Sequence, residues 1–232
     1  MEKPLRILFL GNSHTYMNDI PALFAHIYEK TTGRTAEAVM LAYSGRDLEW
    51  HMNEYLSLRY NLLYGHYDYC VIQQAAHPFP PEETTLKYGT QIIDLCRKAD
   101  TVPVLSMTWA EKAHPENQQK MIDTYTKLAE MTGALLAPAG KVWQEIREKD
   151  PEIELYYRDG EHASPYGDLL IAMVLVRTLT GAVPALPDFI LDYQVEFPED
   201  GRFPHACEDV LSVRIPYDRK QAEILQEAAS RQ

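Results

Sequence analysis

The sequence of 232 residues has few cysteines and a shortage of positive charge. Its three cysteines, Cys70, Cys96 and Cys207, cannot all pair within one chain, and their spacing matches no zinc-ribbon or CxxC pattern. We therefore expect no disulfide framework and a reducing compartment. Lys and Arg number 22 against 34 Asp and Glu, which leaves a net charge of −12. A surface this acidic repels phosphate backbones and anionic lipid headgroups, so we expect no nucleic-acid partner and no membrane partner.

No apolar run in the sequence approaches the length of a membrane span. The first run, Ile7–Leu10, is also too short for the core of a signal peptide, and we expect a cytoplasmic protein. Hydrophobic residues make up 46% of the sequence and charged residues 24%, a balance that excludes intrinsic disorder. The length suits one α/β domain with, at most, a short appendage.

Short apolar runs alternate with segments of helical periodicity along the first 180 residues. The run Ile7–Leu10 ends at Gly11-Asn12, which is typical of a strand buried on both faces of a parallel sheet. Similar runs predict strands at 6–11, 36–41, 69–74, 102–107 and 135–137. Helical spacing predicts helices from Ile20 to a stop at Thr32-Gly33, and over 48–63, 82–99, 115–132 and 165–180. This order predicts an α/β fold, a flavodoxin-like three-layer sandwich with a five-stranded parallel sheet and helices on both faces.

The alternation of apolar runs and helical segments ends near residue 182. After Pro184, four more prolines interrupt any long element: Pro187, Pro198, Pro204 and Pro216. A last helix is expected at about 219–229. Because roughly fifty residues bury only a marginal core by themselves, we expect residues 1–182 to form the main domain and 183–232 an appendage packed on it.

Candidate catalytic side chains follow the first predicted strand and precede the helix at 165–180. Ser13 lies at the turn from a buried strand into a helix, so its hydroxyl should project from the sheet edge. Asp159 and His162 are three residues apart in a glycine-containing turn, close enough for the carboxylate to meet the imidazole Nδ1. Acyl transfer through serine needs such a base and such an acid. Taken singly, Ser13 also fits a turn cap, and His162 a solvated histidine.

Three blocks of the sequence surround these side chains. The first, Ile7–Ser13, is a strand that ends in Gly-Asn-Ser, the second is Tyr43-Ser44-Gly45, and the third is Asp159–Gly167, an Asp-x-x-His turn before a helix. Together, over about residues 5–180, they resemble the SGNH hydrolases, also called GDSL esterases, with Asn12 where that family usually has Asp. The resemblance implies Ser13, Asp159 and His162 as a catalytic triad. A GxSxG nucleophile elbow is absent, which disfavours the α/β-hydrolase form of this chemistry.

The block after the third strand departs from the family pattern. The family has Gly-x-Asn-Asp there, whose asparagine amide donates to the oxyanion, whereas this sequence reads VIQQAAHP over 71–78. An ungapped alignment puts His77 at that position, while branches that act on acetylated sugars use a glutamine that resembles Gln74. We favour Gln74, because a neutral amide donates without a change of tautomer. The predicted oxyanion hole is the N–H groups of Ser13 and Gly45 with Gln74 or His77, although Gln73 could replace them or both could merely line the crevice.

The resemblance implies a serine esterase that hydrolyses a short-chain acyl ester, with an acetyl group on a carbohydrate as the favoured substrate. Asn12, Tyr43 and Trp109 are expected to contact that substrate, since aromatic faces beside polar groups suit a sugar ring. The aromatic residues could equally pack beneath loops. We expect no cofactor, and no metal, because no histidine forms an i,i+4 pair on a clear helix with a carboxylate.

Two other functions stay open at this stage. A non-catalytic carbohydrate-binding relative is allowed because the block after the third strand is degraded. A flavodoxin-like module could cradle a phosphate with Gly11–Thr15, but this segment has a single glycine and no lysine.

Overall fold

A central sheet organises the protein, whose computed structural model describes residues 3–193 and 212–232. Five strands pair in parallel in the order β2-β1-β3-β4-β5. Their bounds are Leu5–Gly11 (β1), Ala36–Ala42 (β2), Tyr69–Ile72 (β3), Val102–Ser106 (β4) and Leu135–Ala137 (β5). Since β1 lies inside the sheet and is covered on both faces, six of its seven residues are buried. The five predicted strands and their parallel pairing are confirmed.

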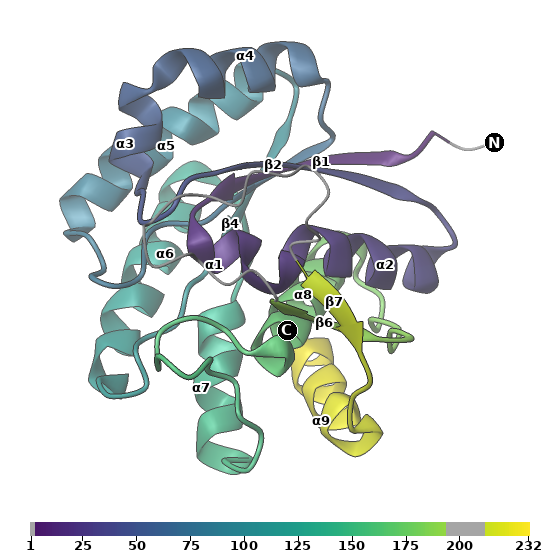
Figure 1. Ribbon diagram of the computed structural model, residues 1–232. Coiled ribbons are helices and arrows are strands. Elements are labelled where there is room, and N and C mark those ends of the chain that lie inside the picture. Colours follow the sequence, from purple (N-terminus) through teal and green to yellow (C-terminus); the bar gives the residue numbers. More distant parts are fainter. Residues whose placement is uncertain (1–2, 194–211) are drawn as a thin grey trace, which may run out of the picture.

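Helices cover both faces of the sheet, as the alternation predicts (Figure 1). One face carries α3 (Leu48–Asn53), α4 (Tyr55–Gly65), α5 (Glu82–Lys98) and α6 (Gln118–Thr132). The other carries α2 (Ile20–Thr32), α7 (Ala139–Lys149), α8 (Pro165–Thr180) and α9 (Arg219–Ser230). Short helical turns are α1 (Ser13–Tyr16), η1 (Met17–Asp19) and η2 (Pro115–Asn117). The flavodoxin-like three-layer α/β sandwich is therefore confirmed.

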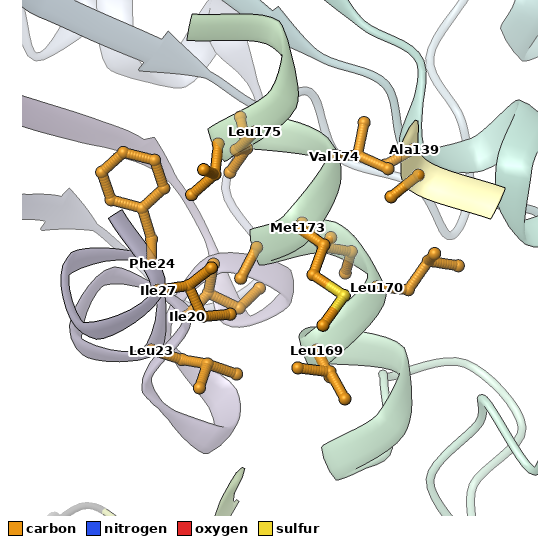
Figure 2. Close-up of a cluster of buried hydrophobic side chains, with 14 of the residues drawn as sticks. Ile20, Leu23, Phe24, Ile27, Ala139, Leu169, Leu170, Met173, Val174 and Leu175 are labelled. Atoms are coloured by element: carbon orange, nitrogen blue, oxygen red, sulfur yellow. The ribbon is translucent and has the colours of Figure 1, made fainter. Parts of the chain in front are cut away.

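The core on the second face is built around α8. Figure 2 shows side chains of α2 and α8 meeting between the two helices, among them Leu23, Ile27 and Met173. Every residue of α8 from 167 to 176 is buried, and the helix contacts α2, α7 and α9. A helix that is apolar on most sides needs such cover, which explains its central place.

The ends of α2 follow from local chemistry. The Asp19 side chain accepts a hydrogen bond from the N–H of Ala22 at 3.2 Å, which satisfies one free donor of the first turn. Gly33 ends the helix with a positive φ of 74°, a conformation that glycine adopts without steric cost. The predicted start and stop of this helix are confirmed.

Two of the helices that cover the sheet differ from the prediction, and the strands Ile190–Tyr193 and Ser212–Ile215 were not predicted. The helix expected over 48–63 breaks at Glu54, where the backbone leaves helical geometry, and becomes α3 and α4. Helix α7 was not predicted, although Val142, Trp143 and Ile146 have helical spacing and are all buried. It begins directly after β5 and a proline.

The last part of the chain combines a small sheet with a helix. Strands β6 (Ile190–Tyr193) and β7 (Ser212–Ile215) pair antiparallel, and α9 packs on α8. The predicted helix at 219–229 is confirmed. Residues 194–211, which include Cys207, lie outside the described residues. The division into a main domain over 1–182 and an appendage over 183–232 stays a proposal.

Candidate active site

Ser13 occupies the turn at the carboxyl end of β1. It is the first residue of α1, and the Asn12 side chain caps this turn by accepting the N–H of His14 at 3.0 Å. The first N–H groups of a helix have no partner within the helix. Within the described residues, the N–H of Ser13 donates to no protein acceptor, so it is available to a bound oxygen atom.

The structure brings Ser13, His162 and Asp159 together. His162 Nε2 lies 2.8 Å from Ser13 Oγ, and His162 Nδ1 lies 2.8 Å from Asp159 Oδ2. Ser13 and His162 are 149 residues apart in the sequence, so only the fold places them in contact. The chain of hydrogen bonds has the order of a serine triad: nucleophile, base and acid.

Asp159 is held by the turn that also carries His162. Its Oδ1 accepts the N–H groups of Glu161 at 2.9 Å and His162 at 3.0 Å. Partial burial acts to raise the pKa of Asp159, but the hydrogen bonds from the Glu161 N–H and from His162 outweigh it. The pKa of Asp159 therefore lies below its ordinary value, and the carboxylate stays charged beside the imidazole.

A second loop, residues 43–46, lies against the nucleophile turn. The N–H of Tyr43 donates to the carbonyl of Gly11 at 3.2 Å, and the Asn12 amide donates to the carbonyl of Arg46 at 3.0 Å. Gly45 has a positive φ of 66°. Its N–H donates to no protein acceptor among the described residues, so it can serve a ligand.

Gln74, the favoured third donor of the oxyanion hole, needs correction. Its side chain is fully buried, with 0% of its surface exposed. The amide donates to Thr85 Oγ1 at 3.1 Å and accepts the N–H groups of Leu48 at 3.0 Å and Ala75 at 2.8 Å. A side chain without exposed surface cannot meet a substrate oxygen, so Gln74 holds α3 and α5 instead.

His77 and Gln73 are occupied as well. His77 places Nδ1 3.1 Å from His14 Nε2 and Nε2 3.0 Å from the carbonyl of Trp109, and only 3% of its side chain is exposed. Gln73 accepts the N–H of Asn12 at 3.0 Å and the hydroxyl of Thr15 at 2.9 Å, and its amide nitrogen donates to the carbonyl of Gln74. Both side chains position the nucleophile turn and its surroundings, and neither is free to donate to an oxyanion.

The three predicted substrate contacts lie in different environments. Trp109 is 2% exposed and stacks on Trp143, with centroids 4.4 Å apart, so its expected contact with substrate is wrong. Asn12 is also buried, and both ends of its amide are engaged within the protein. Tyr43 is 42% exposed and lies against Trp50, with centroids 4.8 Å apart. Of the three, Tyr43 alone can meet a ligand directly.

Sequence reasoning missed two side chains near the site. The Arg46 guanidinium lies 5.2 Å from the centre of the Trp50 ring, which places a cation on the exposed loop beside Gly45. His14 stacks on His162, with centroids 4.6 Å apart. The feature of the sequence that pointed to His14 was its position directly after Ser13.

No group of three or more His, Cys, Asp or Glu side chains in residues 3–193 and 212–232 is arranged to hold a metal ion. Over the same ranges, none of the helices combines the length and apolar character needed to cross a bilayer.

Comparisons with known proteins find matches among solved structures. No protein-family model matches the chain, and no curated protein matches it either. Solved structures do match. A candidate SGNH hydrolase from Slackia heliotrinireducens is 27% identical, with a TM-score of 0.66 over 76% of this chain and 100% of that one. A DUF4886 family protein from Bacteroides uniformis is 18% identical, with a TM-score of 0.67 over 99% of this chain and 94% of that one.

An acetylxylan esterase from Geobacillus stearothermophilus also matches, at 12% identity and a TM-score of 0.64, over 78% of this chain and 97% of that one. At 12% identity this likeness shows the fold alone. The sheet order, the blocks that resemble the family and the structure of 27% identity lead to one conclusion. The chain is a member of the SGNH hydrolase superfamily.

Proposed function

We propose that this chain is a serine esterase that hydrolyses a short-chain acyl ester through an acyl-enzyme intermediate. The observation that carries the proposal is the unbroken hydrogen-bond chain from Asp159 through His162 to Ser13. The free N–H groups of Ser13 and Gly45 support it, because acyl transfer needs donors for the oxyanion.

The proposed reaction has two displacements. Ser13 Oγ attacks the ester carbonyl carbon while His162 Nε2 takes the hydroxyl proton, and the carbonyl π electrons move onto oxygen. The oxyanion is held by the two backbone N–H groups. When the tetrahedral intermediate collapses, the bond to the alcohol breaks and His162 returns the proton to the leaving oxygen. Water then attacks the acyl-enzyme by the same route, and Asp159 stabilises the imidazolium each time.

The substrate we propose is an acetylated carbohydrate. Tyr43 and Trp50 offer aromatic faces beside the loop that carries Gly45, and such faces suit sugar rings. The fold likeness to an acetylxylan esterase makes acetylated xylooligosaccharides a sensible first natural substrate to test. A cytoplasmic location also stays a prediction.

The test is the hydrolysis of p-nitrophenyl acetate by the wild type, Ser13→Ala and Ser57→Ala. Ser57 is a half-buried serine of α4 and serves as the matched control. We expect Ser13→Ala to lower kcat by about 10⁴-fold or more, because nothing else in the site replaces the nucleophile, while Ser57→Ala keeps the wild-type rate. Dialysis against EDTA should leave the rate unchanged, since a serine triad needs no Lewis acid.

Equal rates for Ser13→Ala and the wild type would contradict the esterase. In that case, binding of acetylated xylooligosaccharides measured by calorimetry would indicate the non-catalytic relative, and binding of inorganic phosphate the flavodoxin-like module. Rate loss in Ser13→Ala together with a raised KM in Tyr43→Ala supports both the reaction and the proposed substrate contact.

A further inference from the structure

His14 is a buried histidine that the proposed reaction does not use. Its ring stacks on that of His162, with centroids 4.6 Å apart and an interplanar angle of 26°. His14 follows Ser13 directly in α1. The same helical turn therefore carries the proposed nucleophile and the ring that packs on His162, its proposed base. A near-parallel contact of this kind limits rotation of the His162 ring.

Hydrogen bonding determines which nitrogen of His14 carries a proton. His77 Nε2 lies 3.0 Å from the Trp109 carbonyl, which can only accept, so His77 Nε2 carries a hydrogen. A neutral His77 then accepts at Nδ1, and the His14 Nε2 at 3.1 Å must be the donor. In a neutral His14 this leaves Nδ1 bare, and among the described residues that buried nitrogen has no hydrogen-bond partner.

We propose that His14 is a positioning residue, a neutral imidazole oriented by His77, against which His162 is held in line between Asp159 and Ser13. This inference rests on the proposed esterase function. A positive charge on His14 would repel the imidazolium that forms on His162 during the reaction, so the support must remain neutral.

The surroundings of His14 and His77 favour the neutral form of both rings. Burial lowers the pKa of His14 well below its ordinary value, and the facing charges of His162 and His77 act in the same direction, while the charge of Asp159 and the backbone of Glu161 oppose them. Burial also lowers the pKa of His77. Glu111 and Glu161 oppose that shift by their charge, and His162 reinforces it.

The aromatic contacts of His14 continue into the core, although its ring and that of Trp109 are tilted by 53°. The Trp109 ring lies 5.2 Å from His14 and is stacked on Trp143. Trp109 Nε1 also donates to the carbonyl of Glu161 at 2.9 Å, next to the base in the sequence. The same aromatic group therefore supports both His14 and the turn that carries His162.

The rate test compares His14→Phe, which keeps a ring face, with His14→Leu, which does not. We expect His14→Leu to lower kcat on p-nitrophenyl acetate by about 10- to 100-fold with KM within about twofold, because misplacement of the base affects the chemical step. His14→Phe should stay within about threefold of the wild type. His26 stacks on Phe189 of the same protein at 4.5 Å, so His26→Leu is the matched control and should keep the wild-type rate.

A pH profile tests whether His14 stays neutral while the enzyme works. We expect kcat/KM of the wild type and of His14→Phe to fall in acid with the slope of one proton, since the proposed reaction uses a single general base. A steeper acid limb in the wild type would show that His14 or His77 also gains a proton, and would overturn the inference. So would a His14→Leu variant that folds and keeps the wild-type kcat, or equal losses in both His14 variants.

Nitrogen-15 NMR of the histidine rings tests the protonation state without activity. With His14→Phe used for assignment, wild-type His14 should show a hydrogen on Nε2 and a bare Nδ1 from pH 6 to 8. A charged ring, or a hydrogen on Nδ1, would overturn the proposal. If Ser13→Ala retains full turnover, the esterase fails while the NMR result still decides the state of His14; if only the His14 variants behave unexpectedly, the esterase stands.

Discussion

Each polar side chain behind the nucleophile is held by identified partners. Gln73 accepts the N–H of Asn12, Asn12 accepts the N–H of His14, and His77 pairs with His14. Buried amides and imidazoles are stable only when such partners exist. Among the described residues, the side chains proposed for the oxyanion are engaged in this way, and the N–H groups of Ser13 and Gly45 are the donors left for a substrate.

Gln74→Ala should therefore affect stability and not catalysis. Loss of its carbonyl leaves the buried N–H of Leu48 and the partly buried N–H of Ala75 without an acceptor, which should lower the free energy of unfolding by about 1–3 kcal/mol. We expect kcat on p-nitrophenyl acetate to change by less than about threefold. Urea unfolding and steady-state kinetics give the two numbers.

The control is Gln119→Ala, which removes an exposed glutamine of α6 and should leave both values near those of the wild type. A hundredfold fall in kcat for Gln74→Ala with unchanged stability would restore Gln74 to the oxyanion hole.

Among the elements, α8 links the site to the core. Its N-cap Ser164 accepts the N–H groups of Tyr166 and Gly167, each at 3.2 Å, and begins the helix two residues after His162. A Cβ on Gly167 would lie 2.4 Å from the carbonyl oxygen of Leu155, so only glycine lets this turn approach. The position of the base thus depends on the packing of this helix.

The first turn of α8 also contains a buried acid, Asp168. Burial raises its pKa well above the ordinary value, against a smaller lowering effect of the Asn18 side chain. Its Oδ2 has no hydrogen-bond partner within the described residues. An acid whose pKa is raised on folding favours the folded state below its unfolded pKa of about 3.9, and this advantage is lost as the pH rises through the folded pKa.

Asp168→Asn should therefore be more stable than the wild type at pH 8, by on the order of 1–3 kcal/mol, because an amide does not ionise. The difference should shrink toward pH 4.5, as judged by urea unfolding at both values. Asp123→Asn on the exposed face of α6 is the control, and should stay within about 0.5 kcal/mol of the wild type. A difference that grows toward acid would contradict this account.

For the whole molecule, the question is whether the last helix belongs to the same folding unit. Helix α9 buries Ala222, Leu225, Ala228 and Ala229 in the cluster that also contains α2 and α8. Its contacts with α7 and α8 tie the end of the chain to the layer behind the triad. A single cooperative unfolding transition is the expected consequence.

Leu225→Ala should lower the free energy of unfolding of the whole protein by about 2–4 kcal/mol, since it removes a fully buried side chain. Circular dichroism and tryptophan fluorescence should report the same transition. Leu56→Ala is the matched control, because Leu56 is 67% exposed. Two separate transitions, with only one moved by Leu225→Ala, would show that the appendage folds independently.

The sequence by itself determined most of the helices and strands, and it predicted that Ser13, His162 and Asp159 lie together. Strand β1, the cap at Asp19 and the stop at Gly33 depend on neighbouring residues, so local patterns predict them. Ser13 and His162 could be paired because strand order places both at one edge of a parallel sheet. Helix α7 escaped prediction although its buried residues have helical spacing, and the break at Glu54 escaped prediction because the helical pattern continues on both sides of it.

Only the tertiary structure decided the roles of the side chains around the triad. Gln73 reaches the nucleophile turn while Gln74 reaches Thr85 on α5, because successive side chains of extended backbone point to opposite faces. Adjacent glutamines thus hold different parts of the fold: Gln73 holds the turn that carries Ser13, and Gln74 holds a helix on the other face of the sheet. No sequence motif specifies which glutamine takes which place. The contact of His14 with His162 joins segments 148 positions apart (162 − 14), so it exists only once the sheet has formed.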